Sequence, residues 1–290
     1  MSEYREPSAE LRARVAMEKY RFQTTHSLGQ NFILDDRFID HLLDAAGVCA
    51  SDNVLEIGPG AGVMTSRLAQ RARQVLAIEV DKGLEPVLSE VLNGEENVQL
   101  VFQDVMKADI DSMVNAAFGG ASYRVVANLP YYITADVLLK LVRGERLPES
   151  ISIMVQKEAA QRIMSAPGQK QWCAMAATLQ FYGKPQVLME VQPDIFYPRP
   201  HVTSCFIRLD LYAERPVKPL DEKLFIKLIN AAFAMRRKTL ANNLKAAFGL
   251  SQDKISTVLS AAEIDQRTRG ESLSLEELCR IADGLKTYYD

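Results

Sequence analysis

From residue 53 onward, short apolar runs alternate with segments of helical spacing, and this alternation restricts the fold more than any other feature of the sequence. The runs are almost continuously apolar, as expected for strands of a parallel sheet that helices cover on both faces. Five parallel strands are predicted, at Asn53–Ile57, Gln74–Glu79, Val98–Gln103, Arg124–Ala127 and Ile151–Val155. Two later runs, near Val187–Val191 and Val202–Leu209, are joined by a proline-rich loop too short for a crossover helix, so they are predicted to pair antiparallel at one edge.

The pattern changes after Leu211, where Arg215–Pro219 brings two prolines and looks like a linker. Beyond it the apolar residues follow helical spacing without strands, and Gly249 is a plausible helix stop. The expected fold is therefore α/β, a Rossmann-like, mostly parallel seven-stranded sheet, followed by a small all-α domain. We predict the first domain at residues 1–211, with residues 1–25 as an N-terminal extension, and the helical domain at residues 212–290.

Cysteine usage and terminal composition indicate the compartment. The four cysteines lie far apart and form no C-x-x-C pair, which argues against a disulfide framework or a structural zinc site. The three histidines lack metal-ligand spacing, so no metal is expected. The N-terminus has no apolar signal-peptide core, and no apolar run approaches the length of a membrane span. These features predict a cytoplasmic protein.

The strongest local motif is the glycine-rich run Glu56–Gly62, which follows the first strand and precedes a helical segment. Glycines at such a turn allow a ligand to approach the backbone, and the spacing G-x-G-x-G differs from the dinucleotide fingerprint G-x-G-x-x-G. Glu79 closes the second strand, where it is placed to hold ribose hydroxyls, and Asp104 follows the third, within reach of an adenine amino group. The structural alternative is that the glycines only form a turn and that Glu79 and Asp104 are helix caps or solvated loop residues. Together the three groups favour a cofactor that contains adenosine, because open α/β sheets bind ligands at this edge.

The fourth strand ends in Asn128-Leu129-Pro130-Tyr131, which is also an ordinary way to turn a chain. After a cofactor half-site, however, this motif is typical of enzymes that methylate amino groups. An exocyclic adenine nitrogen is a poor nucleophile, because its lone pair is delocalised into the ring. The Asn128 side-chain oxygen and a backbone carbonyl, of Leu129 or Pro130, are placed to hold its two hydrogens. Tyr131 then offers a face on which a flipped base can stack.

A third cluster, Phe196–Ser204, fills the loop between the two edge strands. Its prolines stiffen it, so Phe196 is a candidate for the opposite wall of a base pocket; burial of Phe196 in the core is the structural alternative. Arg199 and His201 either meet RNA phosphates or face solvent.

The charge balance argues mildly against a nucleic-acid partner when it is taken over the whole chain. The formal net charge is −3, with 34 basic and 37 acidic residues. Arg215–Lys245, however, holds eight basic and two acidic residues. Such a segment is often a solvated helix face, but its charge is also suited to phosphate contacts.

Several motifs in this order resemble the KsgA-type family, the small-subunit ribosomal RNA adenine dimethyltransferases. They are His26–Asp35, the glycine loop, Asn128–Tyr131, Gln156–Glu158, Phe196–Ser204 and Arg236–Leu240, and the resemblance extends over roughly residues 20–285.

The resemblance implies an enzyme that uses S-adenosyl-L-methionine to dimethylate two adjacent adenosines in a hairpin loop near the 3′ end of 16S rRNA, within the 30S particle. It implies cofactor binding by Asn31, Ile33, Gly58, Gly60, Glu79, Asp104 and Asn128. The catalytic and base-binding residues become Asn128, Leu129, Pro130, Tyr131 and Phe196. From their charge, Arg199, Arg236, Arg237 and Lys238 are predicted to bind RNA, although Arg199 stands where the family more commonly has Pro. A monomer with a role in small-subunit biogenesis is expected.

Three alternatives remain at this stage. A methyltransferase that acts on large-subunit (23S) rRNA and confers antibiotic resistance shares the catalytic domain, although the Arg236–Leu240 segment favours the small-subunit enzyme. A non-catalytic ribosome-assembly factor retains the fold but has no need of an intact Asn128–Tyr131 motif. A nicotinamide dehydrogenase is disfavoured by the glycine spacing.

Overall fold

The computed structural model describes residues 7–24 and 29–288, which form two compact units. The first unit joins Met1–Ala160 to Gln186–Leu211, and the second joins Gln161–Pro185 to Tyr212–Asp290. One crossing between the units therefore coincides with the boundary predicted near residue 212. Contacts place residues 161–185 with the second unit, however, whereas the sequence suggested that they belong to the domain at residues 1–211.

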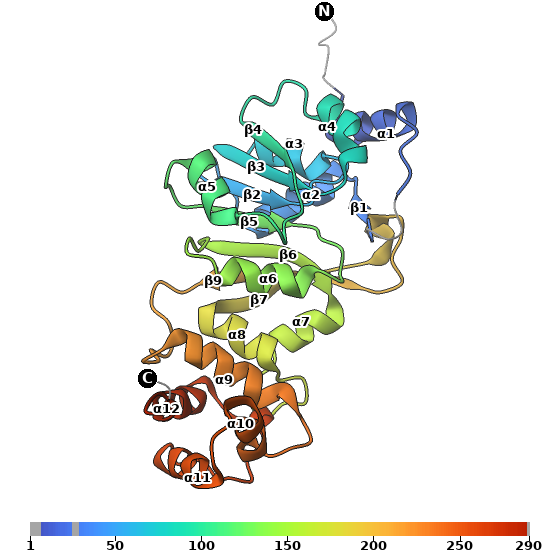
Figure 1. Ribbon diagram of the computed structural model, residues 1–290. Helices are drawn as coiled ribbons and strands as arrows, with labels where there is room; N and C mark the ends of the chain where they lie inside the picture. Colours follow the sequence, from blue (N-terminus) through green and yellow to red (C-terminus); the bar gives the residue numbers. More distant parts are fainter. Residues whose placement is uncertain (1–6, 25–28, 289–290) are drawn as a thin grey trace, which may run out of the picture. The chain divides into compact units, whose positions relative to one another are not determined.

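The first unit is built on a seven-stranded sheet in the order β4-β3-β2-β5-β6-β9-β7 (Figure 1). Neighbours from β4 to β6 are parallel, and β9 runs antiparallel to β6. The α/β prediction is confirmed, and the two late strands are neighbours at one edge as expected. The strands are β2 (Asn53–Ile57), β3 (Gln74–Glu79), β4 (Val98–Phe102), β5 (Arg124–Ala127), β6 (Ser150–Gln156), β7 (Gly183–Val191) and β9 (Ser204–Leu211).

Burial explains why the central strands consist mostly of apolar residues. All five residues of β2 are buried, as are six of the seven residues of β6. The edge strand β4 is only partly buried, and its one polar residue, Gln99, is exposed. The main core cluster of this unit gathers side chains from the sheet and from the helices that pack on it.

Two helices of the first unit show clear capping residues. Asp35 accepts hydrogen bonds from the backbone at the start of α2, and Gly119 ends α5 in the left-handed conformation. The helices are α1 (Ala9–Lys19), α2 (Asp36–Ala45), α3 (Val63–Ala69), α4 (Glu85–Val91), α5 (Ile110–Phe118) and α6 (Thr134–Val142), with α7 (Lys157–Ile163) at the border of the two units. Short 3₁₀ turns lie at Lys82–Leu84 and Pro193–Ile195.

Helix α1 occupies the predicted N-terminal extension and is part of the first unit. Its buried alanines, Ala9, Ala13 and Ala16, contribute to the main core. Arg12 donates a hydrogen bond of 2.9 Å to the hydroxyl of Ser66 on α3. The extension is therefore packed against the sheet-covering helices along this helix.

A second, two-stranded sheet was not foreseen from the sequence. It pairs β1 (Phe32–Ile33) antiparallel with β8 (Phe196–Tyr197). Strands of two residues carry no periodic signal, so neither was predicted. The pairing brings the Gly29–Ile33 segment beside the proline-rich loop, although 162 or more residues separate them in sequence.

The second unit is helical and has its own aromatic core. The rings of Phe181 and Phe225 pack edge to face with centroids 4.9 Å apart, and the fully buried indole of Trp172 donates to the Leu273 carbonyl at 3.0 Å. Gly249 ends a helix, as predicted. The helices are α8 (Ala174–Tyr182), α9 (Glu222–Ala234), α10 (Leu240–Phe248), α11 (Gln252–Ala261) and α12 (Leu275–Lys286), with a 3₁₀ turn at Gly270–Ser272.

Within residues 7–24 and 29–288, no helix is both long enough and apolar enough to span a bilayer. The same part of the chain gathers no group of three His, Cys, Asp or Glu side chains suited to a metal ion.

Candidate active site

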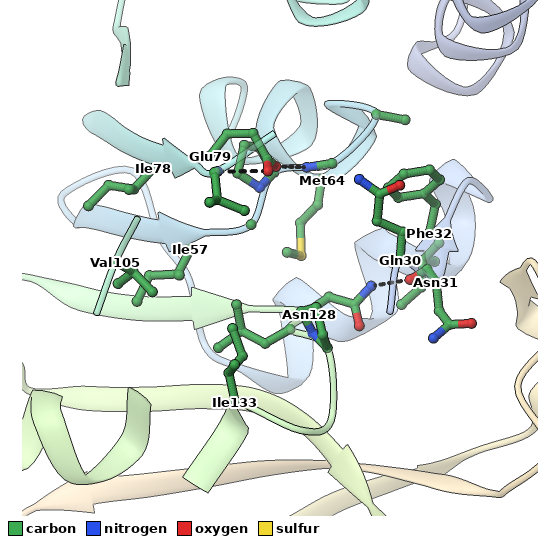
Figure 2. Close-up of a pocket in the computed structure, with 18 of the residues that line it drawn as sticks. Gln30, Asn31, Phe32, Ile57, Met64, Ile78, Glu79, Val105, Asn128 and Ile133 are labelled. Carbon is green, nitrogen blue, oxygen red and sulfur yellow. Dashed lines mark hydrogen bonds between the residues drawn. The ribbon is translucent and has the colours of Figure 1, made fainter. Parts of the chain in front are cut away.

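A cleft of about 880 Å³, which includes its open mouth, lies at the carboxyl ends of β2, β3 and β5 (Figure 2). Polar residues line it at three places: Glu79 at the end of β3, Asn128 after β5, and Asn31 beside β1. The walls are mostly apolar and are formed by Phe32, Ile33, Ile57, Val63, Met64, Ile78, Val105, Leu129 and Ile133 among others.

The glycine loop forms the part of the cleft that follows β2. Gly58 has a φ of +75° and donates a backbone hydrogen bond of 2.9 Å to the Ile78 carbonyl on β3. Gly60 has a φ of +58°, and a Cβ built there would lie 2.7 Å from Cδ1 of Phe32. Side chains are thus excluded at Gly60 both by its backbone conformation and by the Phe32 ring. Both predicted glycines line the cleft.

Glu79 ends β3 and holds the glycine loop in place. One carboxylate oxygen accepts the Gly60 backbone N–H at 3.0 Å, and the other accepts those of Val80 and Asp81 at 2.8 Å each. Burial raises the pKa of Glu79, and the three backbone hydrogen bonds oppose the shift. Two carboxylate oxygens offer about four acceptor sites, so about one remains for a ligand. Glu79 lines the cleft, so this remaining acceptor site belongs to its wall.

Asp104 lies at the margin of the cleft. Its neighbours Gln103 and Val105 line the cleft, but Asp104 does not. The Asp104 carboxylate accepts the backbone N–H of Met106 at 2.9 Å and lies 3.7 Å from the Lys107 ammonium. It therefore closes the turn after β4 in this structure.

Asn128 is the first residue after β5, and its amide is oriented by the backbone of Asn31. Asn128 Nδ2 donates to the Asn31 carbonyl oxygen at 2.9 Å, and Figure 2 shows this bond across the cleft. Only the amide nitrogen can donate to a carbonyl, so this bond fixes the positions of Nδ2 and Oδ1 in the Asn128 side chain. Oδ1 of Asn128 is thereby left as a hydrogen-bond acceptor in the cleft lining.

The two carbonyls that follow Asn128 differ in how they are used. The Pro130 carbonyl accepts the backbone N–H of Ile133 at 3.2 Å and the hydroxyl of Thr134 at 3.1 Å. Within the described part of the chain, no such donor is found at the Leu129 carbonyl. Of the two candidates left open by the sequence, Leu129 is the one with acceptor capacity to spare.

The two tyrosines at the end of this motif have different surroundings. Tyr131 is partly buried, and its hydroxyl forms a 2.5 Å hydrogen bond with that of Ser204. Tyr132 is 62% exposed and lines the cleft, where its ring lies near Gly29.

Phe196 lies in the hydrophobic core of the first unit. It is 4% exposed, it pairs with Ile33 across the small sheet, and it does not line the cleft. This placement agrees with the structural alternative that the sequence left open. Its neighbour Tyr197 is 55% exposed. Of the upstream motif, Gly29–Ile33 is described, and Asn31 and Ile33 line the cleft; residues 26–28 lie outside the described residues.

The predicted RNA-binding residues are exposed but not equivalent. Arg199 lies in the proline-rich loop of the first unit. In the second unit, Arg236 donates to the Lys170 carbonyl at 2.6 Å and lies 3.2 Å from the Glu271 carboxylate. Arg237 and Lys238 are exposed beside it and form no ion pair with any residue that the structure describes. Arg236 therefore has a structural role in this unit, which its sequence position did not reveal.

Several cleft residues were missed from the sequence. Most are apolar or uncharged side chains next to a recognised motif, and their proximity to it is the only signal that was available. They are Gln30, Phe32, Met64, Gln103, Val105, Tyr132 and Ile133.

Glu56, on β2 just before the glycine loop, is a buried carboxyl like Glu79. It is fully buried on β2, and its carboxylate oxygens meet no donor in normal hydrogen-bond geometry among the described residues. Burial raises the pKa of Glu56 to about 8; the Glu79 carboxylate adds to this shift, and the nearby Thr65 hydroxyl opposes it. Glu56 is thus mostly protonated at neutral pH.

Replacing Glu56 by Gln is expected to remove a pH dependence of stability. The folded protein keeps the Glu56 proton up to a pKa of about 8, whereas the unfolded chain releases it near 4.5. The contribution of Glu56 to stability is therefore greatest below pH 4.5 and is lost as the pH rises toward 8. Glu56→Gln should raise the thermal midpoint at pH 8 by about 3–6 °C relative to wild type and change it little at pH 4.5. Circular dichroism melts at both pH values check this. Glu96→Gln, at an exposed position, is the control, and equal shifts at both pH values would contradict the interpretation.

Comparison with known proteins shows the family of this chain. Residues 21–286 match the family described as "Ribosomal RNA adenine dimethylase". A curated relative from Alkaliphilus oremlandii, named "Ribosomal RNA small subunit methyltransferase A", is 40% identical over 270 residues, which cover 93% of this chain and 94% of the relative.

Solved structures show the same fold at lower sequence identity. A dimethyladenosine transferase from Plasmodium falciparum superimposes with a TM-score of 0.73 at 22% identity, covering 87% of this chain and 96% of that one. The 23S rRNA methyltransferase ErmE superimposes with a TM-score of 0.66 at 23% identity, covering 88% and 100% respectively. Because the family pattern extends over almost the whole sequence and a curated relative is this similar, the chain belongs to the ribosomal RNA adenine dimethylase family of enzymes.

Proposed function

We propose that this enzyme transfers methyl groups from S-adenosyl-L-methionine to N6 of two adjacent adenosines in the hairpin loop near the 3′ end of 16S rRNA. It acts as a single chain in the cytoplasm, on the 30S particle, and contributes to small-subunit biogenesis. The observation that carries the proposal is the pair of free acceptors, Asn128 Oδ1 and the Leu129 carbonyl, in the lining of the cleft beside the glycine loop.

The residues of the cleft fit the cofactor. Glu79 has an acceptor site left for a ribose hydroxyl, and the apolar side chains of Ile57, Ile78 and Val105 suit an adenine ring. At Gly60 there is no room for a side chain, so the backbone itself forms the wall. Asn31, Ile33 and Gly58 complete the end of the cleft toward Asn128, and Asp104 borders it at the adenine end. When bound, the cofactor supplies an electrophilic methyl group.

The protein contributes by orienting the target amino group. Asn128 Oδ1 and the Leu129 carbonyl accept one N–H hydrogen each, which favours a pyramidal nitrogen whose lone pair is available for attack. The Pro130 carbonyl takes no part in this, since it is already bound by Ile133 and Thr134. The ring of Tyr131 stacks on the flipped base.

Positioning and exclusion of water account for the rate. No general base is required, because the nitrogen that has gained a methyl group is positively charged and releases its proton readily. The monomethylated amino group keeps one hydrogen, so one of the two acceptors is sufficient to hold it for the second transfer.

Binding to rRNA rests on exposed cations. Arg199 in the first unit, and Arg237 and Lys238 in the second, are available for phosphate contacts. The small-subunit substrate is supported by the name of a relative that is 40% identical over 93% of the chain, whereas ErmE is only 23% identical.

Methyl transfer to ribosomal particles tests the function. Purified enzyme, tritiated S-adenosyl-L-methionine and undermethylated 30S particles should yield labelled 16S rRNA, and nucleoside analysis should recover N6,N6-dimethyladenosine. Naked 23S rRNA serves as the competing substrate. Label in 23S rRNA alone would support the antibiotic-resistance alternative, and absence of label despite measured cofactor binding would support a non-catalytic assembly factor.

A further inference from the structure

We propose that Ser204 is a positioning residue for base binding: its hydroxyl fixes the Tyr131 ring on which the target adenine stacks. This inference rests on the proposed function. The observation behind it is the hydrogen bond between the two hydroxyl groups, with the oxygens 2.5 Å apart. The two residues are 73 positions apart in sequence, so only the fold brings them together.

Ser204 is held rigidly by the sheet. It is completely buried and is the first residue of β9, where it pairs with Gln156 at the end of β6. The adjacent Thr203 carbonyl accepts the backbone N–H of Lys157 at 3.0 Å. A serine held in this way presents its hydroxyl in one place, which is the requirement for orienting another side chain.

Tyr131 is held at its other end by its backbone. The preceding Pro130 carbonyl accepts hydrogen bonds from Ile133 and from the Thr134 hydroxyl, which fix the turn into α6. Burial raises the pKa of Tyr131, so its hydroxyl stays protonated near neutral pH. Backbone and hydroxyl together therefore restrain the ring before any base arrives.

A restrained ring is an advantage for stacking. A free tyrosine loses rotamer freedom when a base packs on it, and this loss weakens binding. The Ser204 bond means that this ordering has already occurred during folding. The same bond links the Asn128–Tyr131 motif to the end of the Phe196–Ser204 segment, so the two clusters that the sequence presented separately meet at these two hydroxyls.

A double-mutant cycle tests the proposal. Ser204→Ala and Tyr131→Phe each delete one of the two hydroxyls and should each lower kcat/KM for 30S particles by about three- to tenfold. The double variant should lose no more than either single variant, because all three lack the same bond. Cofactor affinity and the thermal midpoint should stay close to wild type, and Ser204→Thr, which keeps a hydroxyl, should restore part of the loss. Ser152→Ala, another buried serine of the sheet, is the matched control with unchanged activity.

A second readout reports stacking without requiring methyl transfer. A hairpin RNA with 2-aminopurine at the target position should show fluorescence quenching on binding, and Ser204→Ala and Tyr131→Phe should weaken that quenching equally and without additivity. Losses that add in the double variant, or unchanged quenching in Ser204→Ala, would overturn the proposal. Wild-type enzyme that quenches the probe but leaves 30S particles unlabelled would instead refute the proposed function and leave the role of Ser204 standing.

Discussion

Asn128→Ala should lower kcat by a factor on the order of 10²–10³, while the affinity for S-adenosyl-L-methionine changes little. The substitution removes Oδ1, one of the two acceptors for the target amino group, from a site where Asn31 has already oriented it. Cofactor binding persists because Glu79 and the glycine loop are untouched. Single-turnover methylation of 30S particles gives the rate, and isothermal titration calorimetry gives the cofactor affinity.

Asn128→Asp separates the two functions of the amide. The aspartate keeps an acceptor oxygen but has no N–H to donate to the Asn31 carbonyl, so the orienting bond is lost and two oxygens face each other. We expect a rate well below wild type, although the side chain is nearly isosteric. Asn230→Ala, at an exposed position of α9, is the control for asparagine loss. Wild-type turnover in Asn128→Ala would exclude the role assigned to this residue.

The sheet was predictable because burial dictates sequence along each strand. Val54 and Leu55 are completely buried, and buried strand positions favour apolar side chains, so the strand can be recognised from its own sequence. The ligand-binding edge followed from the same pattern, because parallel strands place their carboxyl ends together. Gly58, Gly60 and Glu79 were therefore placed at this edge of the sheet from the sequence alone, and all three line the cleft.

Features that depend on distant pairings were not predictable. The β1–β8 sheet joins Ile33 to Phe196 through two-residue strands that have no periodicity. Its formation buries Phe196, which the sequence presented equally well as a pocket wall. The bond between Tyr131 and Ser204 likewise arises only when β9 enters the sheet beside β6.

The assignment of residues 161–185 shows the same limit for domains. The segment contains Trp172 and Phe181, both fully buried, and the sequence shows only that they are apolar. Their partners are Leu273 and Phe225, which lie in the C-terminal part of the chain. The second unit is discontinuous in sequence, so a single boundary near residue 212 cannot assign residues 161–185 to it.

Electrostatic predictions were limited by unseen partners. Counting charges identified Arg215–Lys245 as a basic segment, which includes the predicted RNA-binding residue Arg236. In the structure, Arg236 is engaged with Glu271 and the Lys170 carbonyl. Arg237 and Lys238 are therefore the better candidates for the proposed RNA contacts, because they are exposed and form no ion pair with any described residue.

Glu79 is expected to combine the largest loss of cofactor affinity with a loss of stability. Glu79→Ala leaves the backbone N–H groups of Gly60, Val80 and Asp81 without their acceptor, at a cost of about 1–3 kcal/mol for each group that stays buried. The glycine loop then loses its attachment to β3. Removal of the ribose acceptor should also raise the cofactor Kd by about 100-fold.

Glu79→Gln distinguishes ribose recognition from support of the loop. The glutamine keeps one oxygen as an acceptor, but its NH₂ group must face some of the N–H donors that the carboxylate satisfied. We expect a smaller fall in thermal midpoint than in Glu79→Ala, together with a Kd at least about tenfold above wild type, since a neutral acceptor binds a hydroxyl less strongly than a carboxylate does. Calorimetry and thermal melts of both variants, with Glu96→Ala as the exposed control, measure the two effects separately. A fold that melts like wild type and binds the cofactor with unchanged Kd in Glu79→Gln would show that this carboxylate neither supports the loop nor contacts the ribose. The Asp104 carboxylate already accepts the backbone N–H of Met106 and so closes its own turn. Asp104→Ala should therefore raise the cofactor Kd less than either change at Glu79 does.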